Sequence, residues 1–290
     1  MKKALKVLSI VLLLLYLFIP LIATFLFSIC SDWSYSILPK GITFKWYIKL
    51  LTDPRFLLSI GRSFFLAGIS IFISVILLVP SIFAINLYYP KLKKSIGIIT
   101  VACYTVPGVI LSVALVSAYA NLGVPMLIVV LGAYIISSFP LISQGTLNSL
   151  MAIDSKSLME SAEILGASRF EGFKKVILPN ITRGVLSSSL FSFSTLFGEF
   201  VIVNLLLGAR FETIQIFLRK NMVVNGHLSS AIVIFYFVII MLIKRRQNKF
   251  WFKSCFKRFE FRYEKGKFEH FIRFFWMWKI YTSKGNSRFK

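Results

Sequence analysis

Long apolar runs separated by short polar segments dominate the chain. A membrane-spanning helix needs about 20 apolar residues to cross a hydrocarbon core of roughly 30 Å, and lipid offers the backbone no hydrogen-bond partners. Runs of this kind occur at six places: residues 5–29, 63–88, 96–118, 125–149, 185–207 and 228–243. The pattern therefore predicts an all-α, polytopic membrane protein with six transmembrane helices. We expect the first run to be retained, because it is too long for a secretory signal and lacks a small-residue cleavage site.

The polar segments indicate which side of the membrane each loop faces. Lys and Arg in short loops stay on the cytoplasmic side during insertion, and cations cluster before the first run and after the second, fourth and sixth. An even number of spans with both ends in the cytoplasm fits this distribution. It makes residues 154–183 the longest internal loop and places residues 31–62 and 208–227 outside.

Composition supports a membrane protein and excludes other classes. Of the 290 residues, 57% are hydrophobic and 16% are charged, which excludes an ordinary soluble domain and a disordered chain. The three Cys and two His residues lie far apart in the sequence, so no disulfide, metal or hydrolytic site is predicted. We therefore expect the chain not to be an enzyme.

Prolines interrupt the first four runs, at Pro20, Pro80, Pro107 and Pro140. Each removes a backbone donor and favours a kink. Because membrane helices tolerate proline, these kinks are more often a matter of local shape than of function.

The internal loop has the pattern of two short helices separated by a glycine. Apolar residues recur at helical spacing in its first half, at Leu158, Ala162 and Leu165. Asp154 or Ser155 can cap this helix, and Gly166 can end it in a left-handed conformation. Ser168 with Glu171 three residues later is a capping box that opens the second helix, and Pro179 is expected to stop it.

The same loop resembles a known family motif. Its residues match E-A-A-x3-G-x9-I-x-L-P, the EAA loop of binding-protein-dependent ABC transporter permeases, at Glu160, Ser161, Ala162, Gly166, Val176, Leu178 and Pro179. Ser161 replaces the first Ala and Val176 replaces Ile, and the spacing matches throughout. Weaker similarity to the family occurs elsewhere in residues 1–243, at Trp46-Tyr47, Gly198-Glu199-Phe200 and Gly226-His227-Leu228.

The resemblance implies a function for residues 1–243 as a MetI-like permease domain in the bacterial inner membrane. Residues 155–165 would be the coupling helix, seated in a groove of a separate ATPase subunit that binds the ATP, so no cofactor is expected in this chain. The implied partners are ABC ATPase subunits, a second permease subunit, an extracytoplasmic solute-binding protein and membrane lipid. The implied solutes are polyamines, ferric iron, thiamine or phosphonates.

Polar residues in the fifth run are candidates for the translocation path. Glu199 is an acid within a predicted span, and such carboxylates usually face protein or water. Ser192 and Ser194 belong to a serine-rich stretch of the same run. A structural role, in helix packing or in a hydrogen bond to a neighbouring span, is an equal alternative for Glu199.

Residues 244–290 form a basic, aromatic tail that does not match the rest of the chain. They carry 15 of the 34 Lys and Arg residues and 10 of the 30 Phe residues. One interpretation is an anionic lipid or nucleic-acid binder tethered to the membrane. We favour another, an unfolded, out-of-frame translation of an adjoining ATPase gene, in which case no nucleic acid is bound. In the offset frame Trp276, Met277 and Trp278 must read Gly-Cys-Gly, as in a P-loop.

A secondary transporter is a further alternative to the ABC permease. It would not require the EAA spacing, and neither an inverted repeat nor paired broken helices are apparent in the sequence.

Overall fold

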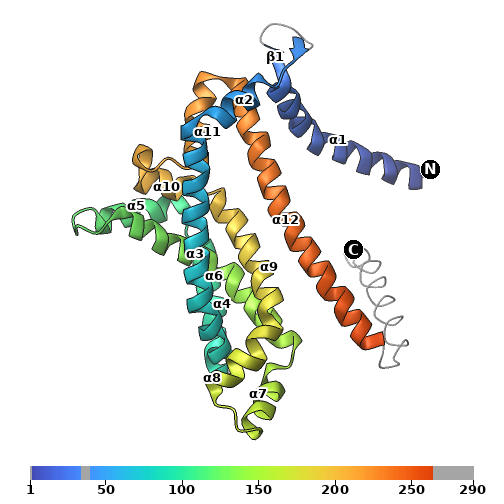
Figure 1. Cartoon of the computed structure of the whole chain (residues 1–290), viewed down its shortest axis with the longest axis vertical. Helices are drawn as coiled ribbons and strands as arrows, with labels where there is room; N and C mark the ends of the chain where they lie inside the picture. Colours follow the sequence, from blue (N-terminus) through green and yellow to red (C-terminus); the bar gives the residue numbers. More distant parts are fainter. Residues whose placement is uncertain (1, 34–39, 264–290) are drawn as a thin grey trace. The chain divides into compact units, whose positions relative to one another are not determined.

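The computed structural model describes residues 2–33 and 40–263, which form α-helices and one short hairpin (Figure 1). The elements are α1 (Lys2–Ile29), β1 (Cys30–Asp32), β2 (Lys40–Ile42), α2 (Lys45–Thr52), α3 (Pro54–Leu87), η1 (Pro90–Leu92), α4 (Lys93–Thr105), α5 (Gly108–Tyr119), α6 (Met126–Ala152), α7 (Ser155–Ile164), α8 (Arg169–Gly172), the π-helix η2 (Phe173–Ile177), α9 (Leu178–Phe197), α10 (Val201–Leu206), η3 (Gly208–Arg210), α11 (Ile214–Val224) and α12 (Gly226–Tyr263). The chain divides into two units, Met1–Lys244 and Arg245–Lys290.

The predicted all-α polytopic architecture is confirmed, whereas the predicted number of spans is approximate. Among the described residues, the helical segments long and apolar enough to cross a membrane are Val11–Ile29, Pro54–Leu87, Met126–Ala152 and Gly226–Arg245. The pair Pro90–Thr105 and Gly108–Tyr119 adds a fifth span if it is counted as one, although its halves meet at 92°. The predicted span 185–207 is not one continuous helix, because α9 ends at Phe197 and α10 begins at Val201.

Proline breaks only one of the four runs that contain it. The chain between α4 and α5 passes through Val106 and Pro107, and Val106 has an extended backbone with ψ 112°. The proline ring disfavours the helical region for the residue before it. Pro20, Pro80 and Pro140 lie inside the continuous helices α1, α3 and α6.

The core forms where α3, α6 and α9 pack against one another. Its largest fully buried side chains include Tyr134, Phe56, Phe197 and Leu66, and buried serines join the helices. The Ser138 and Ser74 hydroxyls lie 2.8 Å apart between α6 and α3. Such polar contacts hold membrane helices together where the hydrophobic effect supplies little driving force.

Small residues let α6 and α9 approach closely. Gly145 and Ser149 lie one turn apart on α6, and Gly184 and Ser188 lie one turn apart on α9. A Cβ added at Gly145 would overlap the Ser188 side chain, and a Cβ added at Gly184 would overlap the Ser149 side chain. The two helices therefore cross through reciprocal glycine–serine contacts, a small-residue interface typical of membrane bundles. Helix α6 leads into the internal loop and α9 leads out of it. Contact between these two helices therefore holds the two ends of the loop close together.

An aromatic stack joins α1, α2 and α12. The His227 ring stacks on Phe27, with ring centroids 4.1 Å apart, and on Trp46, with centroids 5.4 Å apart. His227 Nδ1 lies 2.8 Å from the Phe27 carbonyl oxygen, and Trp46 Nε1 donates to the Cys30 carbonyl at 2.9 Å. Two of the segments that resemble the permease family thus meet in space.

The last helix extends beyond its predicted end. The sequence predicts a short sixth span over residues 228–243, whereas α12 continues to Tyr263. The hypothesis of an out-of-frame tail concerns residues 244–290, of which 264–290 lie outside the described residues. It stays a prediction, which the nucleotide sequence of codons 250–289 tests directly.

Candidate functional site

Helix α7 of the internal loop has one face packed on its own chain. Ser155, Met159 and Ala162 recur at spacings of four and three residues, so they lie on one side of the helix, and all three are buried. Met159 and Ala162 pack toward Gly172 in α8, where an added Cβ would lie 2.7 Å from the Met159 sulfur and 3.6 Å from the Ala162 Cβ. The absence of a side chain at Gly172 therefore allows α7 to lie close to α8.

This buried face differs from the predicted one. The prediction placed Leu158, Ala162 and Leu165 together, and Ala162 is indeed only 6% exposed, but Leu165 is 88% exposed. Leu165 follows the last helical residue of α7 and lies at the turn, so the helical period no longer fixes its direction. The expected cap is also missing, since Asp154 is left-handed with φ 47° and its side chain makes no capping hydrogen bond.

Gly166 forms the elbow after α7, as predicted. Its φ is +84°, a left-handed conformation that costs other residues roughly 1–2 kcal/mol. The Gly166 N–H donates to the Glu163 carbonyl at 2.9 Å, and the Ala167 N–H donates to the Ala162 carbonyl at 3.0 Å. These two bonds make a Schellman motif, which satisfies carbonyls at the end of the helix and reverses the chain.

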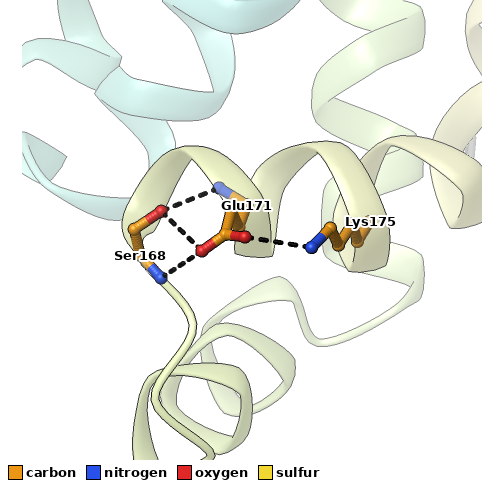
Figure 2. Close-up of polar contacts among 3 residues, drawn as sticks. All are labelled: Ser168, Glu171 and Lys175. Atoms are coloured by element: carbon orange, nitrogen blue, oxygen red, sulfur yellow. Dashed lines mark hydrogen bonds and ion pairs between the residues drawn. The ribbon is translucent and has the colours of Figure 1, made fainter.

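The capping box at the start of α8 is also confirmed (Figure 2). The Glu171 N–H donates to Ser168 Oγ at 3.3 Å, and the Ser168 N–H donates to Glu171 Oε2 at 3.2 Å. Lys175 Nζ lies 2.9 Å from Glu171 Oε1. The hydrogen bond from Lys175, followed by those from Ser168, lowers the pKa of Glu171 from 4.5 to about 2. Glu171 thus fixes the elbow to the helix that follows it.

The pH dependence of this capping box is a testable prediction. The pKa of Glu171 is lower in the folded chain than its ordinary value, so its interactions are fully present above about pH 4.5 and are lost as the pH falls through about 2. The carboxyl chemical shift of Glu171, followed by NMR in detergent, should titrate near the lower value. Lys175→Met should raise this pKa most and Ser168→Ala less, whereas Lys174→Met should leave it unchanged. A wild-type midpoint near 4.5 would contradict the capping geometry.

Pro179 begins a helix and does not end one, so the prediction that it stops the second helix is wrong. Helical backbone continues from α8 through η2 into α9, and Pro179 lies in the first turn of α9. Proline has no N–H to donate to a carbonyl of the preceding helical turn. Its ring would collide with the carbonyl four residues earlier in an α-helix, and the wider π-helical turn of η2 occurs at this point.

The loop is attached to the end of α3 by three side-chain contacts. The Asn86 amide donates to Ser155 Oγ at 3.3 Å, and Phe83 packs on Phe173 with ring centroids 4.7 Å apart. The Arg169 guanidinium lies over the Tyr88 ring at 4.8 Å from its centroid. Because the loop also continues into α9, a displacement of α7 would be passed to both α3 and α9.

The opposite side of α7 is exposed. Glu160 and Ser161 are exposed on the helix, with Glu160 Oε1 3.8 Å from Lys156 Nζ. Beyond them Ile164 and Leu165 are 85% and 88% exposed, and Phe170 is 71% exposed. Three large apolar side chains that face outward at one elbow are typical of a surface that binds another protein. The sequence pattern does not reveal this apolar patch, because it groups Leu165 with Leu158 and Ala162 on one face of a helix.

The remaining motif residues lie where α9 begins. Val176 and Leu178 are half-buried and Pro179 is exposed, and Leu178 packs against the core. The structure thus separates the predicted coupling residues into a pair on the exposed side of α7, Glu160 and Ser161, and a set that shapes or anchors the loop: Ala162, Gly166, Val176, Leu178 and Pro179.

The three candidate path residues differ in their hydrogen bonds. Glu199 is half-buried, and its carboxylate accepts hydrogen bonds from the Val201 and Ile202 N–H groups at 2.8 and 3.1 Å. It therefore caps α10, where a negative charge is favoured. Ser194 donates to the Leu190 carbonyl, and the buried Ser192 hydroxyl has no hydrogen-bond partner among the described residues. A role in translocation stays a prediction.

A family model decides the identity. Residues 76–249 match the model described as "Binding-protein-dependent transport system inner membrane component". The chain belongs to this family. The loop described above lies inside the matched region, and a permease of this family is not an enzyme. The match favours the ABC permease over a secondary transporter.

Known relatives and solved structures agree with this assignment. The chain is 25% identical over 204 residues to the spermidine/putrescine transport system permease protein PotC of Haemophilus influenzae, an alignment of 69% of this chain and 78% of that protein. The PotC protein of Escherichia coli K12 is 25% identical over 205 residues, 69% of this chain and 76% of its own length.

Among solved structures, the fold is similar to a chain of a bacterial ABC transporter involved in the import of the acidic polysaccharide alginate. The TM-score is 0.66 with 17% identity, covering 86% of this chain and 95% of that chain. A chain of the MetNI methionine ABC transporter in an inward-facing conformation gives a TM-score of 0.57 with 15% identity, covering 70% of this chain and 95% of that one. The permease has the MetI-like fold.

Proposed function

We propose that this permease couples ATP hydrolysis to solute import through the elbow formed by α7, Gly166 and α8. The main support for the proposal is that α7 has one buried face and one exposed face. One face is buried against Gly172, and the other presents Glu160 and Ser161 beside the apolar patch of Ile164, Leu165 and Phe170. A groove on an ATPase subunit would cover that exposed side.

The mechanism follows from how the elbow is attached. Closure of two ATPase subunits would push α7 as a rigid body, and the contacts to α3 and α9 would transmit the displacement to the bundle. Rigid-body movement of packed helices is an established route from a local ligand event to a change of access. A second permease subunit would complete the path, and an extracytoplasmic binding protein would deliver the solute. Both chain ends would lie in the cytoplasm.

Site-directed cross-linking of adjacent residues tests the proposed ATPase contact. In a variant without the native cysteines, Ser161→Cys carrying a benzophenone-maleimide should form a product with a co-expressed ATPase subunit. Ala162→Cys is the matched control, because that position is 6% exposed and faces Gly172. A product from position 162 and none from position 161, in a complex that still contains the ATPase, would contradict the proposed orientation of α7.

We further propose a polyamine as the solute. The support is the resemblance to the PotC proteins, whose names give spermidine and putrescine. With its binding protein and ATPase, the permease should take up labelled spermidine into vesicles. Uptake of labelled thiamine without uptake of spermidine would contradict this choice.

A further inference from the structure

A cavity of about 440 Å³ lies beside the first turn of α7. It opens between the end of α3, the start of α4, the end of α6 and α7 itself. Its lining is Asn86, Leu87, Pro90, Lys93, Leu150, Met151, Asp154, Ser155 and Lys156. The volume is in the range of small-molecule sites, about 300–1,000 Å³.

The lining combines two chemistries that suit a phospholipid headgroup. Lys93 and Lys156 supply two positive charges against the single negative charge of Asp154, so the lining is net positive by one. Apolar walls formed by Leu87, Leu150 and Met151 lie in the same cavity. A purely apolar ligand would offer no charge to the two ammonium groups, and a small free anion would leave the apolar walls uncovered.

The position of the cavity favours a lipid as the source of the phosphate. With the proposed topology, the ends of α3 and α6 and the start of α4 lie at the cytoplasmic surface of the membrane. Basic pockets between membrane helices on this side bind the headgroups of anionic lipids. Lys91 and Lys94 are close to Lys93 in the sequence but do not line the cavity, so they provide a matched pair of cations outside it.

Lys156 lines this cavity and also belongs to α7 of the internal loop, which we call the coupling loop from here on. Its ammonium lies 3.8 Å from the Glu160 carboxylate, and both side chains are mostly exposed. Exposed ion pairs of this kind are weak, so a phosphate in the cavity can compete with Glu160 for the same lysine. Glu160 is one of the two motif residues on the exposed side of α7 that would face the ATPase subunit. Occupation of the cavity would therefore change the charge that α7 presents to its partner.

We propose that this cavity binds the phosphate group of an anionic membrane phospholipid through Lys93 and Lys156, and that the bound lipid regulates coupling by drawing Lys156 away from Glu160. The proposal rests on the proposed function of α7 and on the proposed topology. In this proposal the ligand of the cavity comes from the membrane and not from the cytosol.

Lipid retention measured by native mass spectrometry tests the binding step. The complex of permease and ATPase is reconstituted in nanodiscs of phosphatidylcholine with phosphatidylglycerol and is then released in mild detergent. A lysine that contacts the headgroup of an anionic lipid contributes about a fivefold effect on its binding. Lys93→Gln with Lys156→Gln should therefore reduce retained phosphatidylglycerol by at least fivefold, and the matched control Lys91→Gln with Lys94→Gln should retain it. Equal retention in the two double variants would overturn the proposal.

Two further arms identify the source of the phosphate and the regulatory effect. Inorganic phosphate added to nanodiscs of phosphatidylcholine alone should not change the ATPase rate, whereas phosphatidylglycerol should change it in the wild type and not in Lys156→Gln. An equal response to inorganic phosphate would assign the cavity to a soluble anion and overturn the lipid proposal.

Failure of the Ser161→Cys cross-link would contradict the coupling function and leave the lipid-retention result unaffected, so the two failures are distinguishable.

Discussion

Adding one methyl group at Gly145 should loosen the crossing of α6 and α9 and destabilise the permease by roughly 1–3 kcal/mol, the usual cost of overpacking. The new Cβ would overlap Cβ and Oγ of Ser188, and neither helix can yield without moving its backbone. Melting of the detergent-solubilised protein should show Gly145→Ala several degrees below the wild type. Because the crossing joins the two ends of the coupling loop, transport should fall as well.

Two matched variants separate this collision from a general effect of alanine. Gly132→Ala makes the same change on the same helix, where an added Cβ would meet nothing within 4 Å, so it should be neutral or slightly stabilising. Ser188→Gly removes the atoms that Gly145→Ala would strike, so the two substitutions together should recover most of the lost stability, as coupled neighbouring sites do. A Gly145→Ala variant as stable as Gly132→Ala would show that the helices do not approach closely there.

The features that the sequence predicts well are those fixed by residues close together in the chain. Gly166 and the pair Ser168 and Glu171 adopt the predicted left-handed turn and capping box. Each of these depends on hydrogen bonds that span only a few residues, so a local pattern is sufficient. The long apolar runs likewise predict helices, because lipid permits few other structures.

Other features depend on which elements meet in space, and they could not be read from a local pattern. The exposure of Leu165 depends on where α7 ends, and the start of α9 at Leu178 depends on the π-helical turn before it. The pairing of Gly145 with Ser188 joins two helices on either side of the coupling loop. A single sequence shows small residues on both helices but not which of them touch.

Gly166→Val should uncouple ATP hydrolysis from import while leaving the bundle folded. The glycine is at φ +84° with open space around it, so the penalty comes from the backbone conformation and not from a collision. A β-branched residue strongly disfavours this conformation, and the elbow would reposition the exposed face of α7 relative to α8. In proteoliposomes with the ATPase and the binding protein, solute uptake should fall at least tenfold while basal ATP hydrolysis and the melting temperature stay near wild type.

Asparagine at the same position provides the decisive control, because it also adds a side chain but tolerates the left-handed conformation. Gly166→Asn should therefore keep most of the uptake that Gly166→Val loses. If both variants transported normally, the turn at Gly166 would not set the position of the coupling helix, and the elbow could not be the element that transmits movement. If both lost uptake equally, the cause would be the added side chain at the ATPase surface and not the backbone. The expected difference between valine and asparagine thus measures how much coupling depends on the geometry of this one turn.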